Sequence, residues 1–133
     1  MKKISDLYEI HHLALIKNRE DVESGLIQGY VTSHNGLVSS LLHTNSHTET
    51  LAYLTFVQDV ARGNHYHLKK TEQILVLKGT LSLHLHSFQH VAQSHKYMLQ
   101  PADLLIIKPG CVHTFTAQNG DALVLEFSDK KYS

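Results

Sequence analysis

The chain has 133 residues, of which twelve are Asp or Glu and twelve are Lys or Arg, and its hydrophobic content is 42%. This length predicts one domain with a full hydrophobic core, and the zero formal charge gives no electrostatic reason to expect nucleic acid or an anionic membrane as a partner. A single cysteine, Cys111, excludes an intrachain disulfide and is typical of a reducing compartment. No apolar run approaches the roughly 20 residues of a membrane helix, so we expect a soluble cytoplasmic protein.

The first part of the chain predicts an arm followed by short strands. Residues 1–25 form this amino-terminal arm, with one strand or irregular structure over 4–17 and at most one short helix over 18–25. Strands are expected at 26–32, 37–42 and 50–57, and Asn35-Gly36 is a hairpin turn signal.

Further strands fill the second part of the chain. The run 73–77 is rich in leucine and β-branched residues, and Gly79 is expected to end it. Residues 80–86 alternate, so that three leucines share one face and His84 and His86 share the other. Three more strands are expected at 104–107, 114–117 and 122–127, with a hairpin turn at Asn119-Gly120. Many short strands separated by turns predict an all-β sandwich or barrel.

A candidate metal site begins with two histidines and a glutamate. His65 and His67 are two residues apart, so on an extended strand both imidazoles project from one face. A turn through Lys69 and Lys70 can then bring Glu72 beside them on the next strand. Two imidazoles and one carboxylate are part of a ligand set for a divalent metal.

We expect the fourth ligand to be His113, which follows the Pro109-Gly110 turn. The alternative is that all four residues are polar positions on a solvated strand face. Glutamate is seldom buried without a partner, and three histidines that converge on it by chance would be energetically unfavourable. The pattern therefore favours a metal, which can be zinc, iron, manganese or nickel.

The two segments resemble the paired motifs of the cupin superfamily. His65, His67, Glu72 and Gly79 match the first motif, although Gly63 lies closer to His65 than the opening glycine of that motif does. The resemblance covers about residues 50–128 and implies a single domain with the cupin double-stranded β-helix, a jelly-roll barrel with an amino-terminal strand arm.

The second cupin motif matches at Gly110 and His113. Three of its other positions differ, since a glycine, a proline and an asparagine of the motif are replaced by Ala102, Lys108 and Ala117. These differences weaken the turn signature but leave the position of the ligand intact.

The segment 62–67 is similar to cupin domains of bacterial nucleotide-sugar enzymes, namely the 3,4-ketoisomerases and 3,5-epimerases of dTDP-4-keto-6-deoxy sugars. The resemblance implies catalytic roles for His65, His67 and Tyr53, with His65 as the base in the epimerase pattern. By its alternation, Tyr53 faces either the core or the pocket. Arg62 can bind an anionic group of a substrate or form a surface salt bridge.

The chemistry that the resemblance implies is proton transfer next to a ketone. A histidine that ligates a metal has no lone pair left to act as the base, so the sequence leaves both roles of His65 and His67 open. Our leading hypothesis is an isomerase or epimerase of a nucleotide-linked keto-sugar. The alternatives are an iron-dependent cupin oxygenase and a non-catalytic domain that binds a small ligand.

Residues near the motifs have simpler expected roles. Tyr66 should point away from the two flanking histidines, and Cys111 should be a small buried hydrophobe. His84 and His86 lack a following glutamate and should lie on an outward polar face. By analogy with related small cupins, we expect the arm to pair with the sheet of a partner in a homodimer, and a monomer by light scattering would contradict this.

Overall fold

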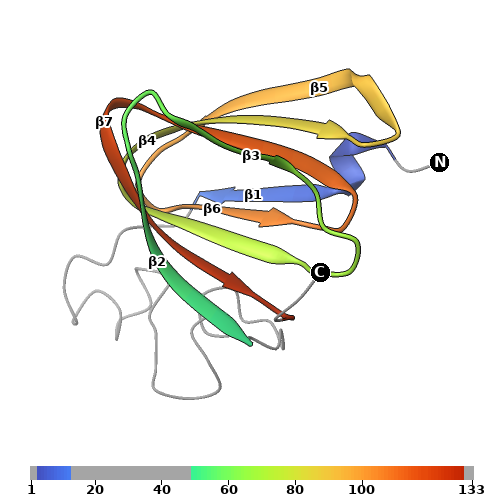
Figure 1. The fold of residues 1–133 in the computed structure, drawn as a ribbon, viewed down its shortest axis with the longest axis horizontal. Coiled ribbons are helices and arrows are strands. Elements are labelled where there is room, and N and C mark those ends of the chain that lie inside the picture. The colour runs from blue at the N-terminus through green and yellow to red at the C-terminus, as the bar shows by residue number, and fades with distance from the viewer. Residues whose placement is uncertain (1–2, 13–48, 131–133) are drawn as a thin grey trace.

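The computed structural model describes residues 3–12 and 49–130, apart from the side chains of 90–92 (Figure 1). A short 3-10 helix, η1 (Ile4–Asp6), precedes the strands. The named strands pair antiparallel throughout, and in chain order they are β1 (Tyr8–His12), β2 (Thr50–Phe56), β3 (Ala61–His65), β4 (Glu72–Ser87), β5 (His90–Leu99), β6 (Asp103–Ile107) and β7 (Cys111–Ser128).

The long strands β4 and β7 pair with each other and belong to two groups of strands. The first group has the order β1-β6-β4-β7-β2 and uses the start of β4 and the end of β7. The second group adds β5 to the later half of β4 and β3 to the earlier half of β7. Figure 1 shows the two groups curving around a shared interior. This is the jelly-roll arrangement that the cupin resemblance implies.

The predicted alternation in the later half of β4 is confirmed. Leu81, Leu83 and Leu85 are completely buried, whereas His84 between them is exposed. These leucines join a core that also receives side chains from the other long strand and from η1. Packing of this kind stabilises the barrel by the removal of apolar surface from water.

The two predicted strand breaks are wrong. β4 continues through Gly79, and β7 continues through Asn119 and Gly120 instead of turning back. All three residues have positive φ angles, and the register between β4 and β7 shifts on either side of Lys78. Since the two strands pair on both sides of this point, the glycines form bulges that bend a continuous pair from one group to the other.

Other predictions have mixed outcomes. Strands are found close to the expected ranges 50–57 and 104–107. Part of the expected arm is β1, which pairs with β6 of the same chain. The strands at 26–32 and 37–42, the turn at 35–36 and the helix at 18–25 lie outside the described residues, and the homodimer stays a prediction. No helix in the described ranges is long and apolar enough to span a membrane.

The bend at Gly79 yields a testable prediction. Its φ is +87°, and a Cβ there would lie 2.7 Å from the Asp121 carbonyl oxygen. We expect Gly79→Ala to lower the free energy of unfolding by about 2–3 kcal/mol, measured by urea titration. Gly120 is the control, because its φ is also positive but no atom lies within 4 Å of a Cβ built there. An equal loss of stability in Gly120→Ala would contradict a role for the close contact.

Candidate functional site

Three histidines converge on one site, where His113 is buried and His65 is exposed. The ligand nitrogens of His65, His67 and His113 all lie within 4.8 Å of one another. Their ring centroids are separated by 4.5 Å for His65 and His113, 5.1 Å for His65 and His67, and 5.5 Å for His67 and His113. The side chains come from β3, from the loop after β3 and from β7, so strand pairing brings together residues that are distant in sequence.

A β-bulge in β3 sets the direction of His65. Arg62 pairs with Phe115 and His65 pairs with His113, although strict alternation would put positions 62 and 65 on opposite faces. The register shift between Gly63 and His65 adds the extra residue that turns both side chains toward the same face. A Cβ at Gly63 would lie 2.5 Å from the His113 carbonyl oxygen, so only glycine permits this approach.

His67 lies beyond the strand on which it was expected, because β3 ends at His65. Its carbonyl oxygen accepts a hydrogen bond of 2.9 Å from the backbone N–H of Gly110, which ties the loop to the second motif. The Nε2 atom lies 3.2 Å from Glu72 Oε1, but the angles do not make a hydrogen bond. Burial lowers the pKa of His67, so its imidazole is neutral near pH 7.

Glu72 is buried among groups that stabilise its charge. Its Oε1 lies 3.4 Å from Lys70 Nζ, and its Oε2 lies 3.6 Å from His113 Nε2. Burial alone would raise the pKa of Glu72, but the neighbouring His67, His113 and Lys70 outweigh burial, and the pKa is lowered. The carboxylate is therefore ionised at neutral pH.

His113 is held in one tautomer by the backbone. Its Nδ1 lies 3.1 Å from the carbonyl oxygen of Cys111, and because a carbonyl only accepts, Nδ1 carries the hydrogen. Burial lowers the pKa of His113 to about 4, so at neutral pH its Nε2 carries a lone pair. This is the form in which an imidazole binds a metal.

These donors fit a divalent metal ion. The lone pair of His113 Nε2 and the ionised Glu72 carboxylate face each other, and two acceptors at that distance repel unless a cation lies between them. His67 Nε2 is a buried nitrogen without a hydrogen bond to any described residue. Three imidazole nitrogens and one carboxylate are ligands that zinc and iron accept.

Glu126 belongs to the same cluster, although neither motif indicates it. It lies on β7, between Ala52 of β2 and Ile74 of β4 in the register, and its carboxyl group interacts with that of Glu72. Burial raises the pKa of Glu126 to about 7, and the charge of Glu72 adds to this effect. Near neutral pH, Glu126 therefore takes up and releases a proton beside an ionised Glu72.

A signal for Glu126 was present in the sequence. It shares one face of the strand with Ala122 and Val124, which are both buried. A carboxylate in the apolar face of a strand requires a partner, and this requirement marks a candidate site residue.

Arg62 and Tyr53 have different positions relative to the cluster. The Arg62 guanidinium carbon lies 5.5 Å from the centre of the Phe56 ring, and its charge acts to lower the pKa of Glu126. Tyr53 is 67% exposed, and its neighbour Ala52 is the residue paired with Glu126. Because side chains alternate, Tyr53 points to the opposite face of β2, and the structure does not bring it to the cluster.

The residues expected to lie outside the site do so. Tyr66 points away from the histidines and stacks on Phe88, with ring centroids 4.7 Å apart and an interplanar angle of 13°. Cys111 is completely buried, and burial raises the pKa of its thiol. His84 is exposed and His86 is half-buried, on the opposite face of β4 from the core leucines.

The pKa of Glu126 yields a prediction with a defined sign. The folded-state pKa, about 7, lies above the ordinary value of 4.5, so the protonated group stabilises the fold below pH 4.5. This stabilisation is lost as the pH rises through 7. The free energy of unfolding of Glu126→Gln minus that of the wild type should therefore increase across this window, by about 1–2 kcal/mol after solvent screening. Urea titrations at several pH values measure this difference, and a difference independent of pH would contradict the assignment.

Comparison with known proteins gives one family match. The family model described as the polysaccharide biosynthesis C-terminal domain matches residues 31–132. A search of curated proteins found no match.

Several solved structures share the fold. QdtA, a sugar 3,4-ketoisomerase from Thermoanaerobacterium thermosaccharolyticum in complex with TDP, has 19% identity and a TM-score of 0.68, and the match covers 95% of this chain and 82% of that chain. The dTDP-4-dehydrorhamnose 3,5-epimerase from Bacillus anthracis, with TDP and PPi bound, has 19% identity and a TM-score of 0.60, covering 78% and 65%.

A third similar structure is CapF, the capsular polysaccharide assembling protein from Staphylococcus aureus. It has 16% identity and a TM-score of 0.58, and the match covers 62% of this chain but only 23% of CapF. At such identities the likeness concerns the fold, which is the cupin barrel. Since the family model matches well over half of the residues, the chain belongs to the polysaccharide biosynthesis C-terminal domain family, with a cupin fold.

Proposed function

We propose that this protein is a metal-dependent cupin that isomerises or epimerises a nucleotide-linked keto-sugar by proton transfer next to the carbonyl group. The observation that carries the proposal is the group of three histidines, with Glu72 beside His67 and His113 and a second carboxyl group, Glu126, beside Glu72. The family match to polysaccharide biosynthesis and the fold shared with a ketoisomerase and an epimerase support a sugar substrate.

The proposed metal ligands are His65, His67, Glu72 and His113. A bound divalent metal, whether zinc, iron, manganese or nickel, would act as a Lewis acid that polarises the carbonyl of the substrate. The hydrogen bond from His113 Nδ1 to the Cys111 carbonyl oxygen keeps Nε2 free for this role. Lys70 beside Glu72 keeps the carboxylate ionised.

Glu126 is the proposed base. The ligating histidines have no lone pair left for a proton, whereas Glu126 lies beside the ligand set and is not needed to complete it. A carboxyl group with a pKa of about 7 can accept and return a proton at neutral pH. Glu126 would take the proton from the carbon next to the polarised carbonyl and, in an isomerisation, return it to the neighbouring position. In an epimerisation, water would deliver the proton to the opposite face of the carbon and take up the proton held by Glu126. His65 and His67 would then serve as metal ligands only and would not have to act as the base as well.

Arg62 is the proposed contact for the anionic part of the substrate. The β-bulge turns it toward the same face as His65, and its side chain remains exposed. A guanidinium group offers a planar pair of donors to a phosphate. The ketoisomerase and epimerase structures contain TDP, which supports a nucleotide-linked substrate for this chain as well.

An iron-dependent oxygenase is the second candidate, because three histidines and one glutamate also suit Fe²⁺. The two candidates differ in their reactants. Oxygen consumption that requires Fe²⁺ would favour the oxygenase and count against the isomerase. Saturable binding of a keto-sugar nucleotide without turnover or exchange would instead indicate a non-catalytic binding domain.

Deuterium exchange tests the proposed reaction. The protein would be incubated in D₂O with dTDP-4-keto-6-deoxyglucose and related keto-sugar nucleotides, and mass spectrometry would follow deuterium incorporation next to the carbonyl. We expect incorporation with the wild type, and a rate lower by about 10²–10⁴-fold in Glu126→Gln because the base is lost.

Two further variants complete this experiment. His113→Ala should abolish exchange by removing a ligand, and Glu9→Gln, the same chemical change on the exposed side of β1, should leave the rate unchanged. Circular dichroism would establish that each variant is folded. Absence of exchange with every keto-sugar nucleotide would overturn the proposed function, whereas full exchange in Glu126→Gln would overturn only the assignment of the base.

A further inference from the structure

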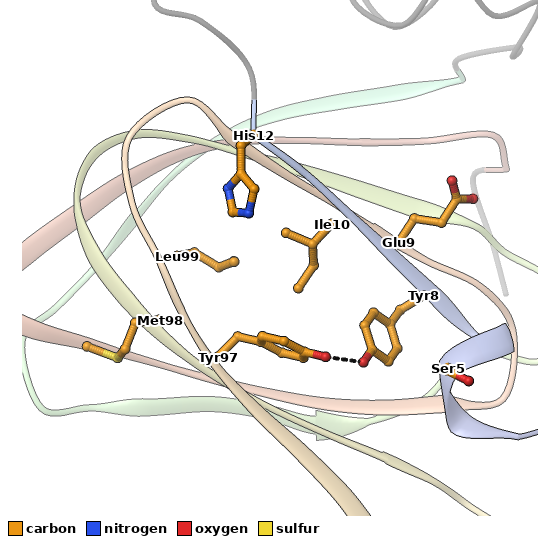
Figure 2. Close-up of a pocket in the computed structure, with 8 residues that line it drawn as sticks. All are labelled: Ser5, Tyr8, Glu9, Ile10, His12, Tyr97, Met98 and Leu99. Carbon is orange, nitrogen blue, oxygen red and sulfur yellow. Dashed lines mark hydrogen bonds between the residues drawn. The ribbon is translucent and has the colours of Figure 1, made fainter.

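A pocket that is distinct from the histidine cluster lies between β1 and β5 (Figure 2). It has a volume of about 320 Å³, within the usual range for small-molecule sites. β1 and β5 are the end strands of the two groups, and within the described part of the chain each pairs with a single strand. None of the lining residues belongs to the proposed metal site or its base, so the pocket has no part in the mechanism above.

A hydrogen-bonded chain of three side chains forms the polar part of the pocket. The Tyr8 hydroxyl contacts the Tyr97 hydroxyl and lies 2.6 Å from His95 Nδ1. Tyr8 has one proton, so it donates to one neighbour and accepts from the other. In one arrangement Tyr97 donates to Tyr8 and keeps free lone pairs, and in the other it keeps a free O–H. Tyr97 can therefore offer a ligand either an acceptor or a donor, and it is 38% exposed.

Several of the other lining residues are apolar, and the carboxylate of Glu9 has partners that can carry positive charge. Figure 2 shows Ile10 and Leu99 pointing into the space between the strands, and Glu9 pointing away from the tyrosines. Glu9 lies 3.2 Å from His11 and 3.4 Å from Lys108. No lysine or arginine is among the described residues that line this pocket, so a phosphate or carboxylate would find no cationic partner there.

His12 is also engaged, since its Nδ1 lies 2.5 Å from Asp103 Oδ1. The pocket thus combines an apolar wall with the hydroxyl groups of Ser5, Tyr8 and Tyr97, of which that of Tyr97 can offer a ligand either a donor or an acceptor. A ligand that matches it is uncharged, has an apolar face and carries hydroxyl groups of its own. Sugar rings have these three properties, because their C–H faces are apolar and their hydroxyls both donate and accept.

We propose that this pocket binds one neutral sugar ring, with the Tyr97 hydroxyl bonded to a sugar hydroxyl and the C–H face of the ring packed on Ile10 and Leu99. The site differs in substrate class from the histidine cluster, for which we propose a phosphate-bearing keto-sugar. The inference stands on the lining of the pocket and does not depend on the proposed reaction.

Nuclear magnetic resonance of protein labelled at its tyrosine rings tests the proposal. The probes are the methyl glycosides of glucose, galactose and fucose, with inorganic phosphate as the anionic comparison. We expect saturable shifts of the Tyr8 and Tyr97 signals for at least one glycoside, with a Kd on the order of 1 mM, and no such shifts with phosphate.

Single substitutions test whether the glycosides bind in this pocket. Tyr97→Phe removes one hydroxyl and should weaken binding about five- to tenfold, as expected for the loss of one hydrogen bond. Tyr66→Phe is the matched control, because Tyr66 has a similar exposure of 40% on another face, and it should bind normally. Ser5→Trp should block the pocket from η1 without removing any group from the hydrogen-bonded chain.

Three results would overturn the proposal. They are the absence of saturable shifts with any of the glycosides, equal shifts with phosphate, and unchanged affinity in both Tyr97→Phe and Ser5→Trp. If Tyr97→Phe does not fold, as judged by circular dichroism, the result for Ser5→Trp decides the question.

Discussion

β3 can lie against β7 only because residue 63 has no side chain. A Cβ at Gly63 would lie 2.5 Å from the His113 carbonyl oxygen, so any other residue would push the strands apart. The same bulge reverses the alternation of β3 and places His65 directly opposite His113. The third histidine then follows in a loop that is fixed by the hydrogen bond from Gly110 to the His67 carbonyl oxygen. The positions of the three histidines therefore depend on the backbone, through the bulge at Gly63 and the hydrogen bond to the His67 carbonyl oxygen.

Burial and nearby charges give the titratable groups of the cluster different protonation states at neutral pH. Burial lowers the pKa of His67 and His113, so both imidazoles are neutral at pH 7, and Lys70 keeps Glu72 ionised. Burial together with the Glu72 charge raises the pKa of the nearby Glu126 to about 7, although the charges of Lys70 and Arg62 act to lower it. The two neighbouring carboxyl groups thus differ in protonation. Glu72 is ionised and can bind a cation, whereas Glu126 can take up and release a proton near neutral pH.

Much of the fold and part of the site could be predicted from sequence alone. Spacing and motif resemblance indicated the barrel, and alternation located the core leucines of β4. The path of the long strands could not be predicted, because a turn signal such as Asn119-Gly120 is local, whereas the pairing of β4 with β7 across the bend is long-range. Alternation could not have placed Arg62 on the same face as His65, because a single bulge in β3 inverts it. For Tyr53 alternation left both faces open, and only the pairing of Ala52 with Glu126 decides the direction.

The central claim is that three imidazoles and one carboxylate hold a metal ion in the barrel. Elemental analysis of protein prepared without a nickel column tests it most directly. We expect about one divalent metal ion per chain in the wild type and little metal in a folded His113→Ala variant. A wild-type protein that contains no metal and binds none of zinc, iron, manganese or nickel when they are added would contradict it.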